Sequence, residues 1–430
     1  MTTKPSHPGL TFRILDPDDA PLDLLDGYLQ AFSRGFHDGR VPVESREHWL
    51  DHVRADRVTL RGAWPEEPVL GGGVLPVATF SSWDATLNAG RRTLPARLIS
   101  DVTVSPTHRR QGLLRTLMTV DLADAAAEGA PLAALTASEG SIYGRFGFGL
   151  ATFTRHLEVD VTARFRLRED VPADDGSVVL LEPAEAWTSV AAVFAGFHER
   201  NRGSVARPQF YEPWLTAVWN FDRHAADPRL RTAVHLDAAG IPDGYVVYEP
   251  EGKRDAAGLS WLRVVDFATT TARAYRRLWR FLADVDMVDR VSWHKAPLDD
   301  PLPWALAEPF AVRTTRVDPL LWVRVLDLPT ALAARPWGAD GVCVIEVDDP
   351  LGHTTGRWRI AVEAGTAEVT PTGAEPDVRL GADTLGALYL GGVPTTALTA
   401  AGRLIGSAGS LANWAAICDV GPTPYCITGF

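Results

Sequence analysis

The sequence has few cysteines and no long apolar segment. Cys343, Cys418 and Cys426 are the only cysteines in a chain of 430 residues. Their number is odd and their spacing fits no metal site, so we expect neither a metal nor a disulfide framework, as in a reducing cytoplasm. No window approaches about 18 uncharged apolar residues, and the N-terminal segment has no apolar run. We therefore expect no membrane helix and no secretory signal.

Positive charge is also scarce. The sequence has 54 acidic and 42 basic residues, which gives a formal net charge of −12. Such a chain would repel the phosphates of nucleic acid, so nucleic acid is not an expected partner. Acidic clefts concentrate small cations, which favours a cationic substrate. Acidity that serves solubility alone is the alternative.

The first part of the chain alternates strand and helix patterns, and its length suggests several domains. Strands are predicted over 10–15, 68–85, 92–105 and 131–138, and helices over 23–36 and 109–130. A glycine-rich loop is predicted over 139–149. The same order of elements recurs between about 156 and 326, with a helix predicted over 272–286. From 327 to 430 the pattern changes to strands with short helices, which indicates a third domain.

The turn between the strand at 92–105 and the helix after it has the chemistry of an anion site. Gly112 opens the helix and follows Arg109 and Arg110. A helix N-terminus offers unpaired N–H groups and a positive dipole end, and glycine lets a pyrophosphate approach the backbone. A solvated basic turn is the alternative. The second copy has Leu278 and Trp279 in place of Gly112 and Leu113, and the bulk of Trp279 would block a phosphate. We therefore expect no cofactor there.

The stretch VTVSPTHRRQGLLRTLM (102–118) resembles the acetyl-CoA-binding motif of the GNAT acetyltransferases, Arg/Gln-x-x-Gly-x-Gly/Ala. Leu114 replaces the last small residue of that motif. With SEGSIYGRFGFG (138–149), the degenerate second half and the terminal phenylalanine, the whole chain resembles the Eis (enhanced intracellular survival) family. The resemblance implies an α/β (α+β) fold. Its parts are an N-terminal GNAT lobe (1–155), a degenerate GNAT lobe (156–326) and a sterol-carrier-protein-like domain (327–430).

The resemblance also implies an activity and an assembly. The activity is acetyl transfer from acetyl-CoA to several amines of an aminoglycoside, and the assembly is a homohexamer built as a trimer of dimers. Acceptors such as protein lysine or a polyamine are an alternative, and so is a non-catalytic ligand-binding protein. The presence of Arg109, Gly112 and Tyr143 argues against a non-catalytic ligand-binding protein. The predicted cofactor-binding residues are Val102, Thr103, Val104, Arg109, Arg110, Gln111, Gly112, Leu113, Leu114 and Ser138.

Tyr143 is the predicted general acid. It lies beside a glycine just after a buried strand, and a phenol with a pKa of about 10 suits a departing thiolate. An aromatic ring packed under a loop is the alternative. The resemblance assigns the general base to the C-terminal carboxylate of Phe430, whose pKa an apolar surround would raise. A chain end at the surface is the ordinary expectation.

Residue Asp101 is particular to this sequence, because the family more often carries an apolar residue there. It could bind a cationic amine, share the role of base, or be a polar residue on the solvent face of its strand. Thr136 stands where a histidine can occur, so substrate preference can differ from that of other members. The remaining candidates for the pocket wall, each equally compatible with core or surface, are Phe36, Asp38, Trp49 and Glu139.

Overall fold

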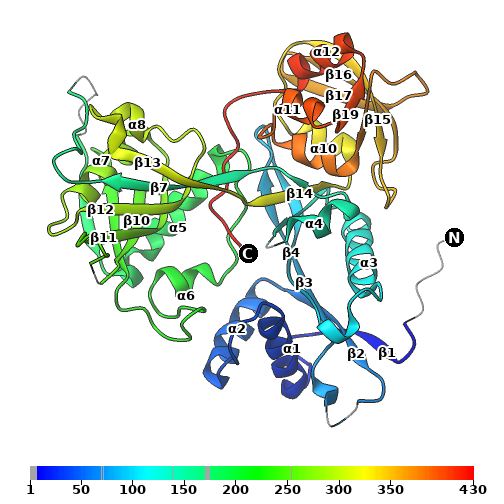
Figure 1. Ribbon diagram of the computed structural model, residues 1–430, viewed down its shortest axis with the longest axis horizontal. Coiled ribbons are helices and arrows are strands. Elements are labelled where there is room, and N and C mark those ends of the chain that lie inside the picture. The colour runs from blue at the N-terminus through cyan, green and yellow to red at the C-terminus, as the bar shows by residue number, and fades with distance from the viewer. Residues whose placement is uncertain (1–6, 69, 71, 138, 170–174, 253) are drawn as a thin grey trace. The chain divides into compact units, whose positions relative to one another are not determined.

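The computed structural model describes the chain except for residues 1–6, 69, 71, 138, 170–174 and 253 (Figure 1). It contains two compact units. The first comprises residues 1–151, 321–421 and 429–430, and the second comprises 152–320 and 422–428. Most of the predicted third domain therefore shares a unit with the first lobe. The domain boundaries at 155 and 326 stay a prediction.

A seven-stranded mixed sheet organises the first lobe. Its order is β1-β2-β3-β4-β5-β14-β6. Strands β4 and β5 are parallel, whereas the other neighbours are antiparallel. The strands are β1 (Leu10–Leu15), β2 (Thr59–Pro65), β3 (Ala78–Asn88), β4 (Thr93–Val104), β5 (Leu132–Thr136), β6 (Gly149–Leu150) and β14 (Leu321–Val325).

The helices of this lobe bury apolar side chains on the sheet. Helix α3 packs Leu117, Met118 and Leu122 in a cluster with Phe80 of β3 and Ile99 of β4. Helix α1 contacts β3 and β4 as well. The helices are α1 (Leu22–Gly35), α2 (Val43–Ala55), α3 (Leu113–Ala127) and α4 (Gly140–Tyr143), with 3-10 turns at Gly72–Val74, Pro106–His108 and Gly144–Phe146.

The C-terminal domain contains a five-stranded sheet of order β17-β16-β15-β18-β19. Its helix α10 packs directly on β6 and β14. A Cβ atom on Gly149 would lie 1.9 Å from the carbonyl oxygen of Asp383, so only glycine allows this approach. The elements are α9 (Leu328–Ala333), β15 (Gly341–Asp348), β16 (Gly356–Glu363), β17 (Thr366–Pro371), β18 (Val378–Gly381), α10 (Ala382–Tyr389), α11 (Thr395–Ala400), β19 (Leu404–Gly406) and α12 (Ala408–Cys418).

The second unit repeats the architecture of the first lobe around a sheet of order β13-β7-β12-β11-β10-β9-β8. Along β10, Val246 and Tyr248 join one buried cluster, and Tyr245 and Val247 join another, as expected for the two faces of a strand. The elements are β7 (Phe153–Asp160), β8 (Ser177–Leu181), α5 (Pro183–Arg200), α6 (Tyr211–Leu215), β9 (Arg231–Leu236), β10 (Pro242–Pro250), β11 (Trp261–Thr269), α7 (Ala272–Ala283), β12 (Arg290–Ala296), α8 (Leu302–Ala305), a 3-10 turn at Pro309–Ala311 and β13 (Val312–Pro319).

Three predictions about these elements need correction. The strand predicted over 68–85 begins only at Ala78, because prolines and a run of glycines precede it. The helix predicted from residue 109 begins at Leu113, after Gly112. Residues 139–149, predicted as a loop, contain α4 and a 3-10 turn.

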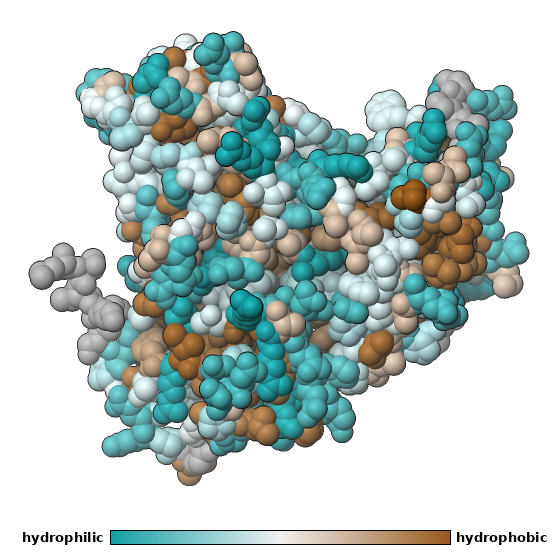
Figure 2. All heavy atoms as spheres, turned by 180° about the vertical axis from the view of Figure 1, so that it is seen from behind, coloured by the Kyte–Doolittle hydropathy of each residue, from teal (hydrophilic) through white to brown (hydrophobic). Residues whose placement is uncertain are grey.

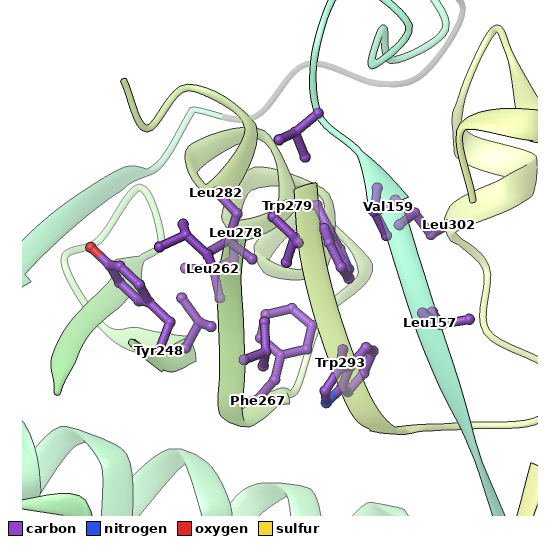
Figure 3. Close-up of a cluster of buried hydrophobic side chains, with 14 of the residues drawn as sticks. Leu157, Val159, Tyr248, Leu262, Phe267, Leu278, Trp279, Leu282, Trp293 and Leu302 are labelled. Carbon is purple, nitrogen blue, oxygen red and sulfur yellow. The ribbon is translucent and has the colours of Figure 1, made fainter. Parts of the chain in front are cut away.

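The position expected for Trp279 in the second lobe is also wrong, whereas the expectation that this lobe binds no cofactor stays a prediction. Trp279 does not stand at the tip of α7. It is fully buried within the helix, and it packs with Phe267 and Trp293, as Figure 3 shows. The tip is Thr271, whose hydroxyl accepts a hydrogen bond from the N–H of Ala274 and donates one to Asp243. The side chains of the protein itself therefore occupy this helix end.

These clusters hold part of the apolar core, and some large apolar side chains are exposed. Figure 2 shows one face of the molecule, on which hydrophobic residues form small groups among hydrophilic ones. Within the described residues, no helix combines the length and the apolar character that a membrane crossing requires.

Candidate active site

Strands β4 and β5 pair over a short stretch and then separate. Their register joins Ala96–Ile99 to Leu132–Leu135, but β4 continues to Val104. Among the described strands, only β3 pairs with residues 100–104. Val102, Thr103 and Val104, which were predicted to bind the cofactor, therefore lie where β4 has an open edge. An extended ligand can hydrogen-bond to such an edge.

The turn after β4 leads into the N-terminus of α3. Gly112 precedes the helix with φ of 84°, a left-handed conformation that glycine adopts readily. Arg110 also has a positive φ, of 62°, and the side chains of Arg109, Arg110 and Gln111 are exposed. Among the described residues, a Cβ atom on Gly112 would have only the ring of His7 within 4 Å, at 3.6 Å. The backbone at this helix tip is thus accessible beside two arginines, and the residues fit a pyrophosphate. Leu113 is buried beneath the tip, and Leu114 is half-buried.

The C-terminus lies at the point where β4 and β5 separate. The hydroxyl of Thr136, the residue after the last position of β5 that pairs with β4, donates a hydrogen bond to a terminal oxygen of Phe430. The Phe430 ring contacts Trp83 of β3 edge to face, with 5.5 Å between centroids. The last residue is therefore tied to the sheet of the first lobe and is half-buried there.

Tyr143 ends helix α4 and is 8% exposed. Its ring meets Phe148 edge to face. Burial, with a smaller contribution from the charge of Glu139, raises the pKa of Tyr143 to about 12. The phenol therefore keeps its proton throughout the neutral range.

Asp101 lies in a β-bulge of β4. Thr79 pairs with Thr103, and Ser81 pairs with Ser100, so residues 101 and 102 oppose the single residue 80. Asp101 has φ of 52°, and its carbonyl and carboxylate oxygens accept hydrogen bonds from the hydroxyls of Thr79 and Ser81 at 2.6 and 2.8 Å.

The electrostatic environment of this carboxyl group is unfavourable to its charge. Burial raises the pKa of Asp101, although the hydrogen bond from Ser81 and the charge of His52 oppose the increase. Burial and the charge of Asp101 in turn raise the pKa of Tyr28 well above its usual value. A cation would therefore be attracted to this part of the lobe.

The predicted pocket-wall residues have different surroundings. Phe36 follows α1 and is 43% exposed, and Asp38 is exposed nearby. Trp49 is buried in an aromatic cluster, stacked on Tyr28 with 6.2 Å between centroids. Glu139 is exposed at the start of α4. Ser138, predicted to bind the cofactor, lies outside the described residues.

Sequence reasoning missed the partners of Asp101 and of Phe430. Ser81 and His52 act on Asp101 from another strand and from a helix, and Trp83 meets the Phe430 ring. No local pattern marks these residues. Thr136 was noticed only as a difference from the family, and its hydrogen bond to Phe430 gives that difference a physical meaning.

Comparison with known families supports the three-part architecture. Residues 18–151 and 203–325 each match a family described as an acetyltransferase (GNAT) domain. Residues 328–427 match a family described as a sterol carrier protein domain. The fold and these matches define an N-acetyltransferase with two GNAT domains and a sterol-carrier-protein-like domain, as the sequence predicted.

Individual relatives show which family within this class of N-acetyltransferases the chain belongs to. The N-acetyltransferase Eis of Mycobacterium tuberculosis is 35% identical over 375 residues, which are 85% of this chain and 87% of that protein. An uncharacterized N-acetyltransferase of Streptomyces griseus is 35% identical over 360 residues, 81% of this chain and 86% of the relative. The crystal structure of Eis1 from Mycobacterium abscessus has a TM-score of 0.82 at 28% identity and covers 98% of this chain and 100% of its own. This chain belongs to the Eis family of GNAT N-acetyltransferases.

The raised pKa of Asp101 predicts how pH acts on stability. A carboxyl group whose pKa is raised by folding destabilises the fold when ionised, and this penalty disappears below the unfolded pKa, near 3.8. We expect Asp101→Asn to melt at a higher temperature than the parent at pH 8. The difference should shrink as the pH falls towards 4 in calorimetric scans. A lower melting temperature for the variant at pH 8 would contradict the assignment.

Proposed function

We propose that this enzyme transfers acetyl groups from acetyl-CoA to several amines of an aminoglycoside-like cationic acceptor. GNAT acetyltransferases use acetyl-CoA, and an acetyltransferase of this family acts on an amine. The observation that carries the proposal is the separation of β4 from β5, with an accessible helix tip at one end and the chain terminus at the other.

The first lobe would hold the donor. The N–H groups at the tip of α3 and the charges of Arg109 and Arg110 suit the pyrophosphate, and Gly112 leaves the backbone accessible. The open edge at Val102–Val104 would hold the extended arm of the cofactor and offer N–H groups to the acetyl oxygen. Acetyl-CoA supplies the thioester carbonyl that the amine attacks.

Two groups would move the protons. The carboxylate of Phe430 only accepts hydrogen bonds when ionised, and we assign it the proton of the attacking amine. Tyr143 remains protonated because its pKa is about 12, and we assign its phenol the transfer of a proton to the departing sulfur. Buried surroundings disfavour the thiolate as well, so proton transfer from so weak an acid is less unfavourable there than in water.

Asp101 would attract the acceptor. Its carboxylate is half-buried on the strand that lines the proposed acetyl site, and His52 and Ser81 are its neighbours. A polyamine antibiotic carries several ammonium groups, so one can approach the carboxylate while another is acetylated. Phe36, Asp38 and Glu139 are exposed and remain proposed wall residues, whereas the buried position of Trp49 suits a role in supporting Tyr28.

The remaining features that the resemblance implies are proposals of the same kind. We propose a homohexamer, arranged as a trimer of dimers, that acts in the cytoplasm and confers aminoglycoside resistance. Trp304 and Phe310 are 83% and 85% exposed, which supports an interface between subunits on the second lobe.

The role of the helix tip can be tested with two glycines that lie on either side of helix α3. Gly112 and Gly129 flank α3 with φ of 84° and 86°, and both have space for a Cβ atom. Alanine at either position should cost about 1–2 kcal/mol of stability through the same backbone strain. Only Gly112→Ala should weaken acetyl-CoA binding, by ~10-fold or more, because its strain displaces the N–H groups that face the pyrophosphate. Titration calorimetry on both variants measures this, and equal affinities would exclude the tip.

The role of the terminal carboxylate can be tested by extending the chain. Two glycines added after Phe430 convert the carboxylate into an amide that cannot accept a proton. We expect kcat to fall by ~100-fold or more, with little change in the KM for acetyl-CoA. The same two glycines added before Met1 serve as the control. Undiminished turnover in the extended protein would rule out the carboxylate as base.

The acceptor class can be tested by product mass. With acetyl-CoA in excess over the amines of a kanamycin-type aminoglycoside, we expect products that carry two or more acetyl groups. Asp101→Asn should raise the KM for this acceptor by ~10-fold and leave the KM for acetyl-CoA unchanged, because only the acceptor is cationic at that carboxylate. Acetylated polyamine or lysine peptide without any aminoglycoside product would replace this acceptor class with the alternative.

A further inference from the structure

Strand β14 contacts both ends of the segment that carries Tyr143. A Cβ atom on Gly140 would lie 3.0 Å from the Trp322 ring, and one on Gly147 would lie 2.5 Å from Nη1 of Arg324. Trp322 and Arg324 are two residues apart on β14, so their side chains extend from the same face of the strand. The segment therefore rests on two side chains of one strand.

Hydrogen bonds within the turn connect Gly147 to Tyr143. The N–H of Gly147 donates to the carbonyl of Gly144 at 2.9 Å, and the N–H of Phe148 donates to the carbonyl of Tyr143 at 3.3 Å. Gly147 has φ of 83°, which a side chain would oppose. A shift of Gly147 is therefore transmitted through this turn to the backbone of Tyr143.

Arg324 is fixed by the C-terminal domain. Its side chain has no exposed surface, and Nη2 donates to both carboxylate oxygens of Asp349 at 2.7 and 2.6 Å. Asp349 also accepts hydrogen bonds from the N–H groups of Leu351 and Thr354 and from the Thr354 hydroxyl. The loop after β15 thus holds the carboxylate, and the carboxylate holds the guanidinium against Gly147.

The buried pair of Arg324 and Asp349 is not explained by its contribution to stability. Nε and Nη1 of Arg324 are buried and find no hydrogen-bond partner among the described residues. Burial lowers the pKa of Arg324, against the opposing charge of Asp349. A buried ion pair with unsatisfied donors is commonly no more stabilising than a well-packed apolar pair. A role in placing the turn explains why the arginine stands there.

We propose that Arg324, held by Asp349, is a positioning residue for acetyl transfer that keeps Tyr143 in place. The sterol-carrier-protein-like domain thereby supports the chemistry of the first lobe. This inference rests on the proposed role of Tyr143 as general acid.

A double-mutant cycle tests the inference. Arg324→Met and Asp349→Asn should each lower kcat by ~10-fold or more and leave the KM for acetyl-CoA within about twofold, because they displace the acid and not the cofactor site. Tyr143→Phe should lower kcat further. In the Tyr143→Phe background either substitution should have almost no additional effect on kcat, because the phenol that they position is gone.

The matched control is Arg335→Met. Arg335 is also a buried arginine, but it donates to Leu388 and to Cys418 within the C-terminal domain. Its substitution should lower the melting temperature and leave kcat within about twofold at a temperature where the variant is folded. If Arg324→Met does not fold, Asp349→Asn, which keeps the shape of the side chain, carries the test.

The outcomes separate this inference from the proposed function. If Tyr143→Phe retains the parental kcat, the role of the acid fails and the inference fails with it. If Tyr143→Phe lowers kcat but Arg324→Met or Asp349→Asn has its full effect in that background, the acid role stands and the positioning role is overturned. An equal loss of kcat in Arg335→Met would also overturn it, because general destabilisation would then account for the effect.

Discussion

The short parallel pairing between β4 and β5 is the constraint on which the rest of the site depends. Four residues of each strand are in register, and the strands then diverge where the bulge at Asp101 adds a residue to β4. A bulge increases local twist and bends its strand, which turns β4 away from the line of its pairing with β5. The open edge of β4, the end of β5 at Thr136 and the turn to Gly112 all follow from it. Without the divergence β5 would cover the edge of β4, and the backbone that the proposed function assigns to the cofactor would already be paired.

The second lobe has the same divergence but lacks the turn. Strand β11 pairs with β12 only up to Val264 and continues to Thr269. Helix α7 then starts at Ala272, so residues 270–271 replace the connection that residues 105–112 form in the first lobe. Thr271 caps the helix, and Asp243 receives its hydroxyl hydrogen bond. A carboxylate already beside the helix end would repel a pyrophosphate. We therefore expect that a splayed sheet alone does not make a cofactor site.

The sequence could predict those features whose signals lie within a few neighbouring residues. The strand over 92–105, a helix after that strand and the order of elements in the second lobe have signals within a few residues of each element, and the structure confirms them, although the helix begins at Leu113 and not at 109. The partners of Asp101 and the hydrogen bond from Thr136 to Phe430 join residues far apart in the chain. The insertion of β14 between β5 and β6 is a pairing of the same kind, which hydrophobic periodicity cannot reveal. The error at Trp279 arose because the two helices were matched by residue type and not by where each helix begins.

Two groups of buried charge in the first unit lie beside the elements that carry the proposed chemistry, while Arg61, Arg97 and Asp121 form a further buried cluster that the proposal does not use. Arg324 and Asp349 are fully buried beside the turn of Tyr143, and Asp101 carries a charge that its surroundings disfavour. Each such group makes the fold less stable than an apolar side chain of similar volume would make it. Arg324 and Asp349 fix the position of a backbone turn through directional contacts, which apolar packing does less precisely. In the proposed function Asp101 instead attracts the acceptor, which needs a charge. Under these proposals the two losses of stability have different physical reasons, which are the position of a turn for Arg324 and Asp349 and the affinity for a cation for Asp101.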